Sequence, residues 1–115
     1  MCGIAGALDW TGALSSREMA QRIAQMIAPI RHRGPDAHGV ITTGHVGLGH
    51  RRLSILDLNR RADQPMKSRD ARVWVVFNGE IYNFRELRLE LIEKGYSFDT
   101  ECDTEVLVYG WIAWG

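Results

Sequence analysis

Hydrophobic side chains recur at helical spacing in the first third of the chain, where they form one apolar face: Met19, Ile23, Met26, Ile27 and Ile30. Ser15 stands just before this face and Glu18 follows three residues later, which predicts a capping box at the start of a helix. Pro29 restricts the residue before it, so the helix is expected to end at about Ala28.

Short strands are expected on both sides of this helix. Residues 2–8 predict a strand whose glycines permit close backbone approach, and residues 40–42 and 46–55 predict a hairpin. Residues 73–77 are apolar throughout and predict a strand that is buried on both faces. Residues 31–39 and 57–72 contain proline and many polar side chains, so we expect loops there.

The last third of the chain begins with a turn signal and a second helix. Asn78-Gly79 is the strongest short-range signal for a tight hairpin turn. Asn83 and Glu86 predict a second capping box, and Lys94-Gly95 is expected to close the helix that follows. Residues 96–98 predict a short strand.

A last helix is expected from Thr104 to about Trp114, with Asp103 as its N-cap. Its side chains are apolar on most sides: Val106, Leu107, Trp111, Ile112 and Trp114. A helix of this kind is normally buried, so we expect further layers to cover it and interpret residues 1–115 as a C-terminally truncated domain. Missing strands would leave exposed edges, so we also predict poor solubility or self-association.

The composition narrows the class of protein. The 115 residues allow one domain at most, and 14 basic against 14 acidic residues argue against binding to nucleic acid or a membrane surface. We find no signal peptide and no membrane-spanning stretch, so Cys2 and Cys102 are expected as reduced thiols in the cytoplasm. The histidine spacings match no zinc site, and we expect no metal or cofactor in this domain.

Cys2 is the strongest candidate for chemistry. Removal of Met1 would leave its thiol and a free α-amine on one residue. Such an amine has a pKa of about 7.7–8.0 and can accept the proton of the thiol, which makes the residue a nucleophile with its own base. The alternative is a small buried side chain in the first strand.

Six separated segments carry a resemblance to a known family: Met1-Cys2-Gly3-Ile4, Arg31-His32-Arg33-Gly34-Pro35-Asp36, His50-Arg51-Arg52-Leu53-Ser54-Ile55, Gln64-Pro65-Met66, Asn78-Gly79-Glu80-Ile81-Tyr82-Asn83 and Asp103-Thr104-Glu105-Val106. Together they resemble the N-terminal part of the class II glutamine amidotransferase domain of glutamine-hydrolysing asparagine synthetases. The resemblance implies an α/β fold of the N-terminal-nucleophile type, a four-layer αββα sandwich with two antiparallel sheets between helical layers.

The same resemblance implies the catalytic residues. Cys2 would attack the side-chain amide carbon of glutamine, and its own amine would pass the proton to departing ammonia. Asn78 with its side-chain amide and Gly79 with its backbone N–H would bind the oxyanion. A thioester on Cys2 would then be hydrolysed to glutamate. A simple hairpin turn is the alternative interpretation of Asn78-Gly79, and the two roles are compatible.

Substrate-binding roles are implied for three further residues. Arg52 would hold the α-carboxylate in a bidentate pair, Asp103 would bind the α-ammonium group, and Glu80 would orient the substrate. The alternatives are ordinary surface charges at Arg52 and Glu80 and a simple N-cap at Asp103. Arg33 and Asp36 are expected to support the loop of the nucleophile.

Two neighbours of these residues carry predictions of their own. Strand alternation is expected to turn Arg51 to the face opposite that of Arg52. Cys102 stands where similar domains often have serine, which would place a second thiol near the pocket.

The predicted function is hydrolysis of glutamine to glutamate and ammonia, with the ammonia passed to ATP-dependent synthesis of asparagine from aspartate. The resemblance implies that ATP and Mg²⁺ belong to a synthetase domain downstream of residues 1–115. A homodimer is one candidate assembly of the full-length protein, whose oligomeric state the sequence does not determine. Three alternatives stay open: an amidotransferase acting on a sugar or peptide, a non-catalytic domain that binds an amino acid, and a thiol-redox module. Against the thiol-redox module, the sequence contains no Cys-x-x-Cys motif.

Overall fold

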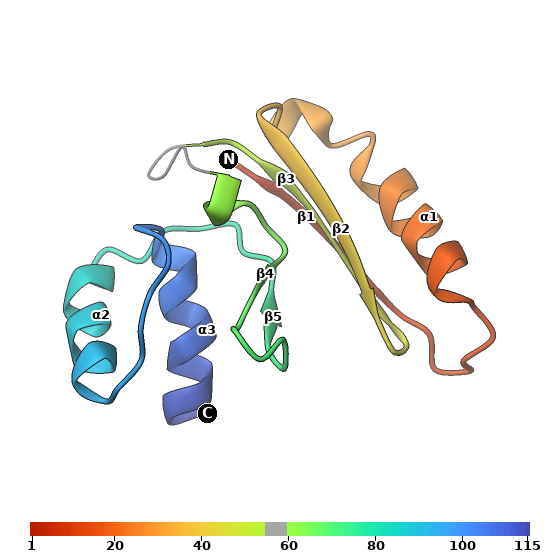
Figure 1. The fold of residues 1–115 in the computed structure, drawn as a ribbon. Coiled ribbons are helices and arrows are strands. Elements are labelled where there is room, and N and C mark those ends of the chain that lie inside the picture. Colours follow the sequence, from red (N-terminus) through yellow and green to blue (C-terminus); the bar gives the residue numbers. More distant parts are fainter. Residues whose placement is uncertain (55–59) are drawn as a thin grey trace.

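The computed structural model describes residues 1–54 and 60–115. Its first half is a three-stranded antiparallel sheet in the order β1-β3-β2, made by β1 (Gly3–Leu8), β2 (Ala37–Thr43) and β3 (Val46–Arg52). Helix α1 (Ser16–Ile27) covers one face of this sheet (Figure 1). The strand and hairpin predictions are confirmed, although β2 begins earlier than expected and β3 ends at Arg52; the expected last residue, Ile55, lies outside the described residues.

The predicted capping box of α1 is present. The backbone N–H of Glu18 donates to Oγ of Ser15 at 3.2 Å, and the N–H of Ser15 donates to Oε2 of Glu18 at 2.8 Å. The apolar face of the helix then packs on glycines of β3, since a Cβ at Gly47 would lie 2.6 Å from Ile23. Small residues in the sheet therefore let the helix approach closely.

The direction of β3 side chains decides which residues face the second half of the molecule. Gly47 and Gly49 face α1, and Arg51 also lies on this side, because its Nε donates to the carbonyl oxygen of Ile27 at 3.0 Å. His50 and Arg52 point the other way. The predicted opposition of Arg51 and Arg52 is confirmed.

The second half of the chain lies against this other face. In this half the short 3₁₀ helix η2 (Arg60–Ala62) precedes β4 (Met66–Lys67), which pairs antiparallel with β5 (Trp74–Val75). A similar short helix, η1 (Arg31–Arg33), precedes β2 in the first half. Helices α2 (Phe84–Glu93) and α3 (Asp103–Trp114) pack on each other, and α3 also contacts the small sheet. Figure 1 shows the resulting order: α1, the three-stranded sheet, the small β4-β5 sheet, and then α3 and α2. The α/β fold with two antiparallel sheets between helices is confirmed.

Several local predictions are wrong. The strand expected over 73–77 contains only Trp74 and Val75 and is half-buried, and residues 96–98 form no strand. The loops expected over 31–39 and 57–72 contain short elements, except that 57–59 lie outside the described residues. Pairing with a neighbouring strand, rather than apolar composition alone, determines where these strands exist.

The predicted caps of α2 and α3 are also wrong. Asn83 occupies the N-cap position without a side-chain hydrogen bond to the helix, so the box with Glu86 does not form. Asp103 is the first residue of α3 and Cys102 is its N-cap residue, again without a side-chain capping bond. Asn78-Gly79 forms a bend and not a primed hairpin turn, since neither residue has a positive φ. Lys94-Gly95 does close α2, with Gly95 at φ +96°.

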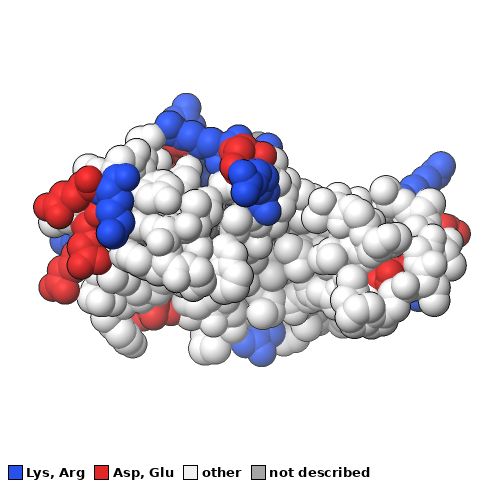
Figure 2. Space-filling view, turned by 90° about the horizontal axis from the view of Figure 1, so that it is seen from below, with Lys and Arg blue, Asp and Glu red and all other residues white. Residues whose placement is uncertain are grey.

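Helix α3 is buried at its start and exposed towards its end. Val106, Val108 and Tyr109 lie in the core, whereas Trp111 is 66% and Trp114 47% exposed. Figure 2 shows a largely uncharged surface when the molecule is seen from below, with charged side chains gathered mainly towards its edges. The apolar end of α3 is therefore uncovered in this structure.

Candidate functional site

One pocket brings together most of the side chains singled out in the sequence. Cys2, Arg52, Gly79, Glu80 and Asp103 all line it, and its volume is about 70 Å³. They come from the residue just before β1, the end of β3, the bend after β5 and the start of α3. Residues from opposite ends of the chain, such as Cys2 and Asp103, therefore share one concave site between the two halves of the fold.

The thiol of Cys2 is held at the edge of this pocket by backbone groups of β3's continuation. Its Sγ accepts a hydrogen bond from the N–H of Leu53 at 3.3 Å and lies 3.7 Å from the carbonyl oxygen of Leu53, to which the thiol donates. The side chain is half-buried, and Met1 before it is 73% exposed. The sulfur is thus fixed in position, and the preceding residue is accessible to a processing enzyme.

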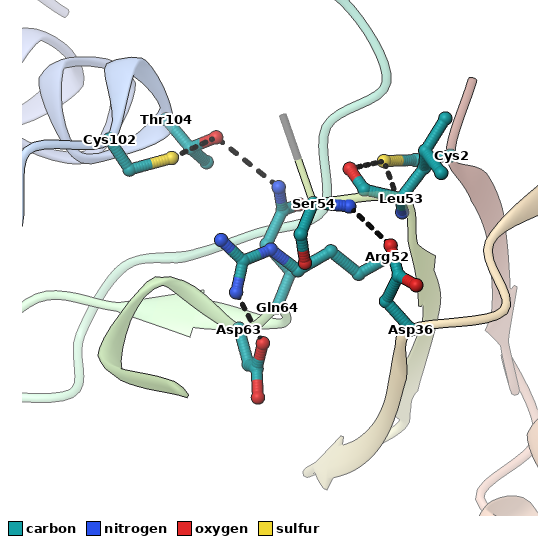
Figure 3. A network of polar contacts seen from close by, with 9 residues as sticks. All are labelled: Cys2, Asp36, Arg52, Leu53, Ser54, Asp63, Gln64, Cys102 and Thr104. Atoms are coloured by element: carbon teal, nitrogen blue, oxygen red, sulfur yellow. Dashed lines mark hydrogen bonds and ion pairs between the residues drawn. The ribbon is translucent and has the colours of Figure 1, made fainter. Parts of the chain in front are cut away.

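Arg33 and Asp36 lie behind the pocket rather than in its lining. Nε of Arg33 donates to the carbonyl oxygen of Cys2 at 3.2 Å. The carboxylate of Asp36 accepts from the N–H of Ser54 at 2.8 Å, and its own N–H donates to the carbonyl oxygen of Arg52 at 3.0 Å. Both residues therefore hold backbone that carries pocket residues, as Figure 3 shows for Asp36 and Ser54.

Arg52 is a buried cation with a carboxylate partner. Its Nη1 lies 2.6 Å from Oδ1 of Asp63, and the exposed fractions of the two side chains are 8% and 32%. In Figure 3 the guanidinium group extends from the Cys2 side of the site towards α3. Because a buried charge is costly without a partner, the ion pair with Asp63 compensates the burial of the Arg52 guanidinium group in this position. The sequence analysis did not identify Asp63.

Asp103 is a buried carboxylate whose hydrogen bonds go outside its own helix. Its Oδ2 accepts from the N–H of Ile81 at 2.9 Å, and Oδ1 lies 3.6 Å from Sγ of Cys102. The expected N-cap role is replaced by this link to the segment that follows Gly79 and Glu80. The pocket therefore contains a cationic side chain from β3 and an acidic one from α3.

Asn78 is placed less directly than the other predicted residues. It is half-buried between Phe77 and Gly79, and the described pocket lining includes both of these neighbours but not Asn78 itself. A Cβ at Gly79 would lie 2.7 Å from Cζ of Phe77, so the glycine rests directly on this ring. The position of the Asn78-Gly79 pair thus depends on Phe77.

Gln64 and Thr104 belong to the site although the sequence analysis assigned them no role. Gln64 is buried, its Nε2 donates to Oγ1 of Thr104 at 3.2 Å, and its Oε1 accepts from the N–H of Phe77 at 2.6 Å. Gln64 stands in a segment that carried the family resemblance, which was the only signal available. Its partners lie 13 and 40 residues away along the chain, and no local pattern reveals such contacts.

His50 is a second buried polar side chain that the sequence analysis left without a role. It is fully buried, and Nε2 lies 3.3 Å from the carbonyl oxygen of Phe77. Burial lowers the pKa of His50 and the charge of Arg52 lowers it further, against the opposing effects of the Phe77 bond and Asp63. The imidazole is therefore held in its neutral form.

The two thiols of the site differ in environment. Cys102 is buried beside the first turn of α3, and burial raises the pKa of its thiol. Cys2 is half-buried at the pocket edge, and both cysteines are free, as expected. The thiolate is the reactive form of cysteine, so Cys102 is poorly suited to act as a nucleophile.

Residues 1–54 and 60–115 contain neither a cluster of metal ligands nor a helix that could span a membrane. No group of three or more His, Cys, Asp or Glu side chains in these ranges is arranged to hold a metal ion. None of the helices in the same ranges has the length and hydrophobicity that crossing a membrane requires.

Comparisons with known proteins add an independent line of information. A family model described as "Glutamine amidotransferase domain" matches residues 1–115. The chain is 46% identical over 108 residues to "Asparagine synthetase (glutamine-hydrolyzing) 1" of Bacillus subtilis (strain 168), which covers 94% of this chain and 17% of that protein. It is 37% identical over 109 residues to the protein of that name in Arabidopsis thaliana, with 95% and 18% covered.

A relative with another name matches over the same region. "Amidase chyE" of Penicillium rubens is 35% identical over 116 residues, which cover 94% of this chain and 17% of that protein. The chain therefore spans less than a fifth of the length of these relatives.

Proposed function

The chain belongs to the glutamine amidotransferase domain family, and on this premise we propose that its pocket hydrolyses glutamine to glutamate and ammonia. The observation that carries the proposal is the position of the Cys2 thiol in a pocket that also contains Arg52 and Asp103. The nucleophile would cleave the side-chain amide bond of the substrate. The cation and the anion would bind the two charged groups at its α-carbon.

In the proposed reaction the sulfur of Cys2 attacks the amide carbon of the glutamine side chain. The α-amine of Cys2, freed by loss of Met1, accepts the thiol proton and delivers it to the leaving nitrogen, so that ammonia departs and a thioester remains. Water then attacks the thioester, which releases glutamate and restores the thiol. Asn78 and the N–H of Gly79 would stabilise the oxyanion that forms in each step.

The charged groups of the pocket would bind the two ends of the substrate. Arg52, oriented by Asp63, would bind the α-carboxylate, and Asp103 would bind the α-ammonium group. Glu80 lines the same pocket and would orient the substrate. Arg33 and Asp36 would keep Cys2 and residues 52–54 in place through their backbone hydrogen bonds.

The proposal is tested with a diazo-ketone analogue of glutamine, followed by intact-mass measurement and peptide mapping. We expect Met1 to be absent and a single adduct to form on Cys2, and glutamine should block this adduct. Cys2→Ala should remove both the adduct and the release of ammonia, and Cys102→Ser should remove neither. Retention of Met1 would contradict the mechanism, and turnover that survives Cys2→Ala would indicate contamination or another site. Binding of glutamine without release of ammonia would favour a non-catalytic binding domain.

For the fate of the ammonia, we propose transfer to ATP-dependent asparagine synthesis in a longer, cytoplasmic protein. In this proposal residues 1–115 are part of the glutaminase domain, a synthetase domain that binds ATP and Mg²⁺ follows it, and the whole protein is a homodimer. The names of the Bacillus and Arabidopsis relatives support this acceptor. The Penicillium relative, named an amidase, supports a different acceptor as the second candidate. Formation of asparagine from aspartate, ATP and glutamine by the full-length protein would distinguish the two.

A further inference from the structure

The backbone of Phe77 is held by side chains and not by a neighbouring strand. Strand β5 ends at Val75, and Phe77 stands in the irregular segment that follows it. The N–H of Phe77 donates to Oε1 of Gln64 at 2.6 Å, and its carbonyl oxygen lies 3.3 Å from Nε2 of His50. Both polar backbone groups of one residue are therefore bound by side chains from other elements.

The geometry fixes the direction of the His50 hydrogen bond. A carbonyl oxygen only accepts, so Nε2 must carry the proton, and Nδ1 is then an acceptor. Within the described part of the chain this buried Nδ1 has no hydrogen-bond partner. A phenylalanine or leucine would fill the same space without an unpaired buried acceptor, so the bond to Phe77 is what distinguishes histidine here.

The held peptide lies directly before the pair that we propose to bind the oxyanion. Phe77 is bonded to Asn78, and Gly79 rests on the Phe77 ring. His50 belongs to β3, which continues into Leu53, the residue that holds the Cys2 thiol. Gln64 continues the connection to Thr104 on α3. The His50 bond thus ties the segment of Asn78 and Gly79 to the strand that positions the nucleophile, and the Gln64 bond ties the same segment to α3.

We propose that His50 and Gln64 are positioning residues for the reaction, because they clamp the Phe77 peptide and so set the distance between Cys2 and the Asn78-Gly79 pair. This inference rests on the proposed function and extends it by two residues: His50, which lies outside the described pocket lining, and Gln64, which lines the pocket and acts here through its bond to Phe77. A clamp of this kind acts on the transition state. Its loss should lower kcat, while binding of glutamine by other pocket residues changes little.

The test compares kcat and KM for glutamine hydrolysis in the unmodified chain and four variants. His50→Leu removes the donor, and Gln64→Met removes the acceptor with little change in volume. His50→Gln places an amide N–H where Nε2 stood. His38→Gln is the matched control, because His38 is exposed on β2.

We expect His50→Leu and Gln64→Met to lower kcat on the order of 100-fold with KM changed by less than about 3-fold, as for a misplaced catalytic group. His50→Gln should recover most of the loss, and His38→Gln should behave like the unmodified chain. If His50→Leu does not fold, His50→Gln and Gln64→Met decide the matter, since each retains the size of the side chain. Folding is checked by circular dichroism and thermal unfolding.

Folded His50→Leu and Gln64→Met proteins with unchanged kcat would overturn the inference. So would a loss of kcat that follows only the folded fraction and is not recovered by His50→Gln. Failure of the proposed function gives a different result: the unmodified chain then releases no ammonia and forms no glutamine-blocked adduct on Cys2. In that case this inference fails together with the function on which it rests.

Discussion

Replacing Asp103 by asparagine separates substrate binding from structural support at the start of α3. Asp103 is 4% exposed and lines the pocket, and its carboxylate accepts a hydrogen bond from the N–H of Ile81 at 2.9 Å. The amide oxygen of Asp103→Asn can still accept that bond, so the free energy of unfolding should change by less than about 1 kcal/mol. What is lost is the negative charge that we propose to bind the α-ammonium group of glutamine.

The magnitude follows from the strength of a hydrogen bond to a charged group, which is about 1.5–3 kcal/mol. Since 1.4 kcal/mol is a factor of ten, KM for glutamine should rise about 10- to 150-fold. The change in kcat should be small, because the interaction is made equally with the bound substrate and with the transition state. Steady-state ammonia release measured over a range of glutamine concentrations gives both parameters.

Two controls make the experiment specific. Glutaramic acid is glutamine without its α-ammonium group, so the variant and the unmodified chain should hydrolyse it with equal KM. Asp99→Asn removes an exposed carboxylate that pairs with Arg69 outside the pocket lining, and it should leave KM for glutamine unchanged. An unchanged KM for glutamine in Asp103→Asn, or an equal rise for both substrates, would refute the assignment of the ammonium site to Asp103.

The remaining predictions concern the second thiol, the helices and pH. Cys102→Ser should leave glutamine-blocked labelling of Cys2 unchanged in peptide mapping, because burial raises the pKa of the Cys102 thiol. Ser15→Ala should lower the free energy of unfolding by about 1 kcal/mol in urea titrations, with Ser15→Asn as a capping control. Trp111→Lys should reduce concentration-dependent self-association in sedimentation, because Trp111 is 66% exposed on the apolar end of α3. Burial lowers the pKa of His50 in the folded chain below its unfolded value of about 6.5, so the unfolded chain binds more protons below that pH. The contribution of neutral His50 to the free energy of unfolding is therefore fully present above about pH 6.5 and decreases as the pH falls below this value. In urea titrations between about pH 6.5 and 4.5, the free energy of unfolding should decrease less for His50→Gln than for the unmodified chain.

Local patterns predicted the first helix well because its signals are local. The residues of its capping box are three positions apart, and its apolar face repeats every three or four residues. The same reasoning was wrong at Asn83 and Asp103. The carboxylate of Asp103 binds the N–H of Ile81, 22 residues away, instead of its own helix. Where a side chain has a distant partner, the preference of its type for a cap no longer decides its role.

The wrong prediction of a strand over 73–77 shows that a local pattern also fails to identify the partners of backbone polar groups. Its apolar residues satisfy the pattern of a buried strand, but only Trp74 and Val75 find a strand partner, in β4. Beyond them, the polar groups of Phe77 are satisfied by Gln64 and His50. Buried backbone groups need partners, and a sequence pattern does not say whether a strand or a side chain will supply them.

For the pocket, the sequence predicted which residues have a function but not the contacts that hold them in place. Arg52 and Asp103 were identified through the family resemblance, which identifies positions that have a function but not the contacts that maintain them. Asp63 keeps the buried Arg52 paired at 2.6 Å, and Gln64 joins Phe77 to α3, and neither contact has a local signal. A substrate-binding charge in a buried pocket requires such a supporting partner, because an isolated charge there would lose its hydration without compensation. The supporting residues are therefore as much a part of the proposed glutamine site as the residues that would touch glutamine.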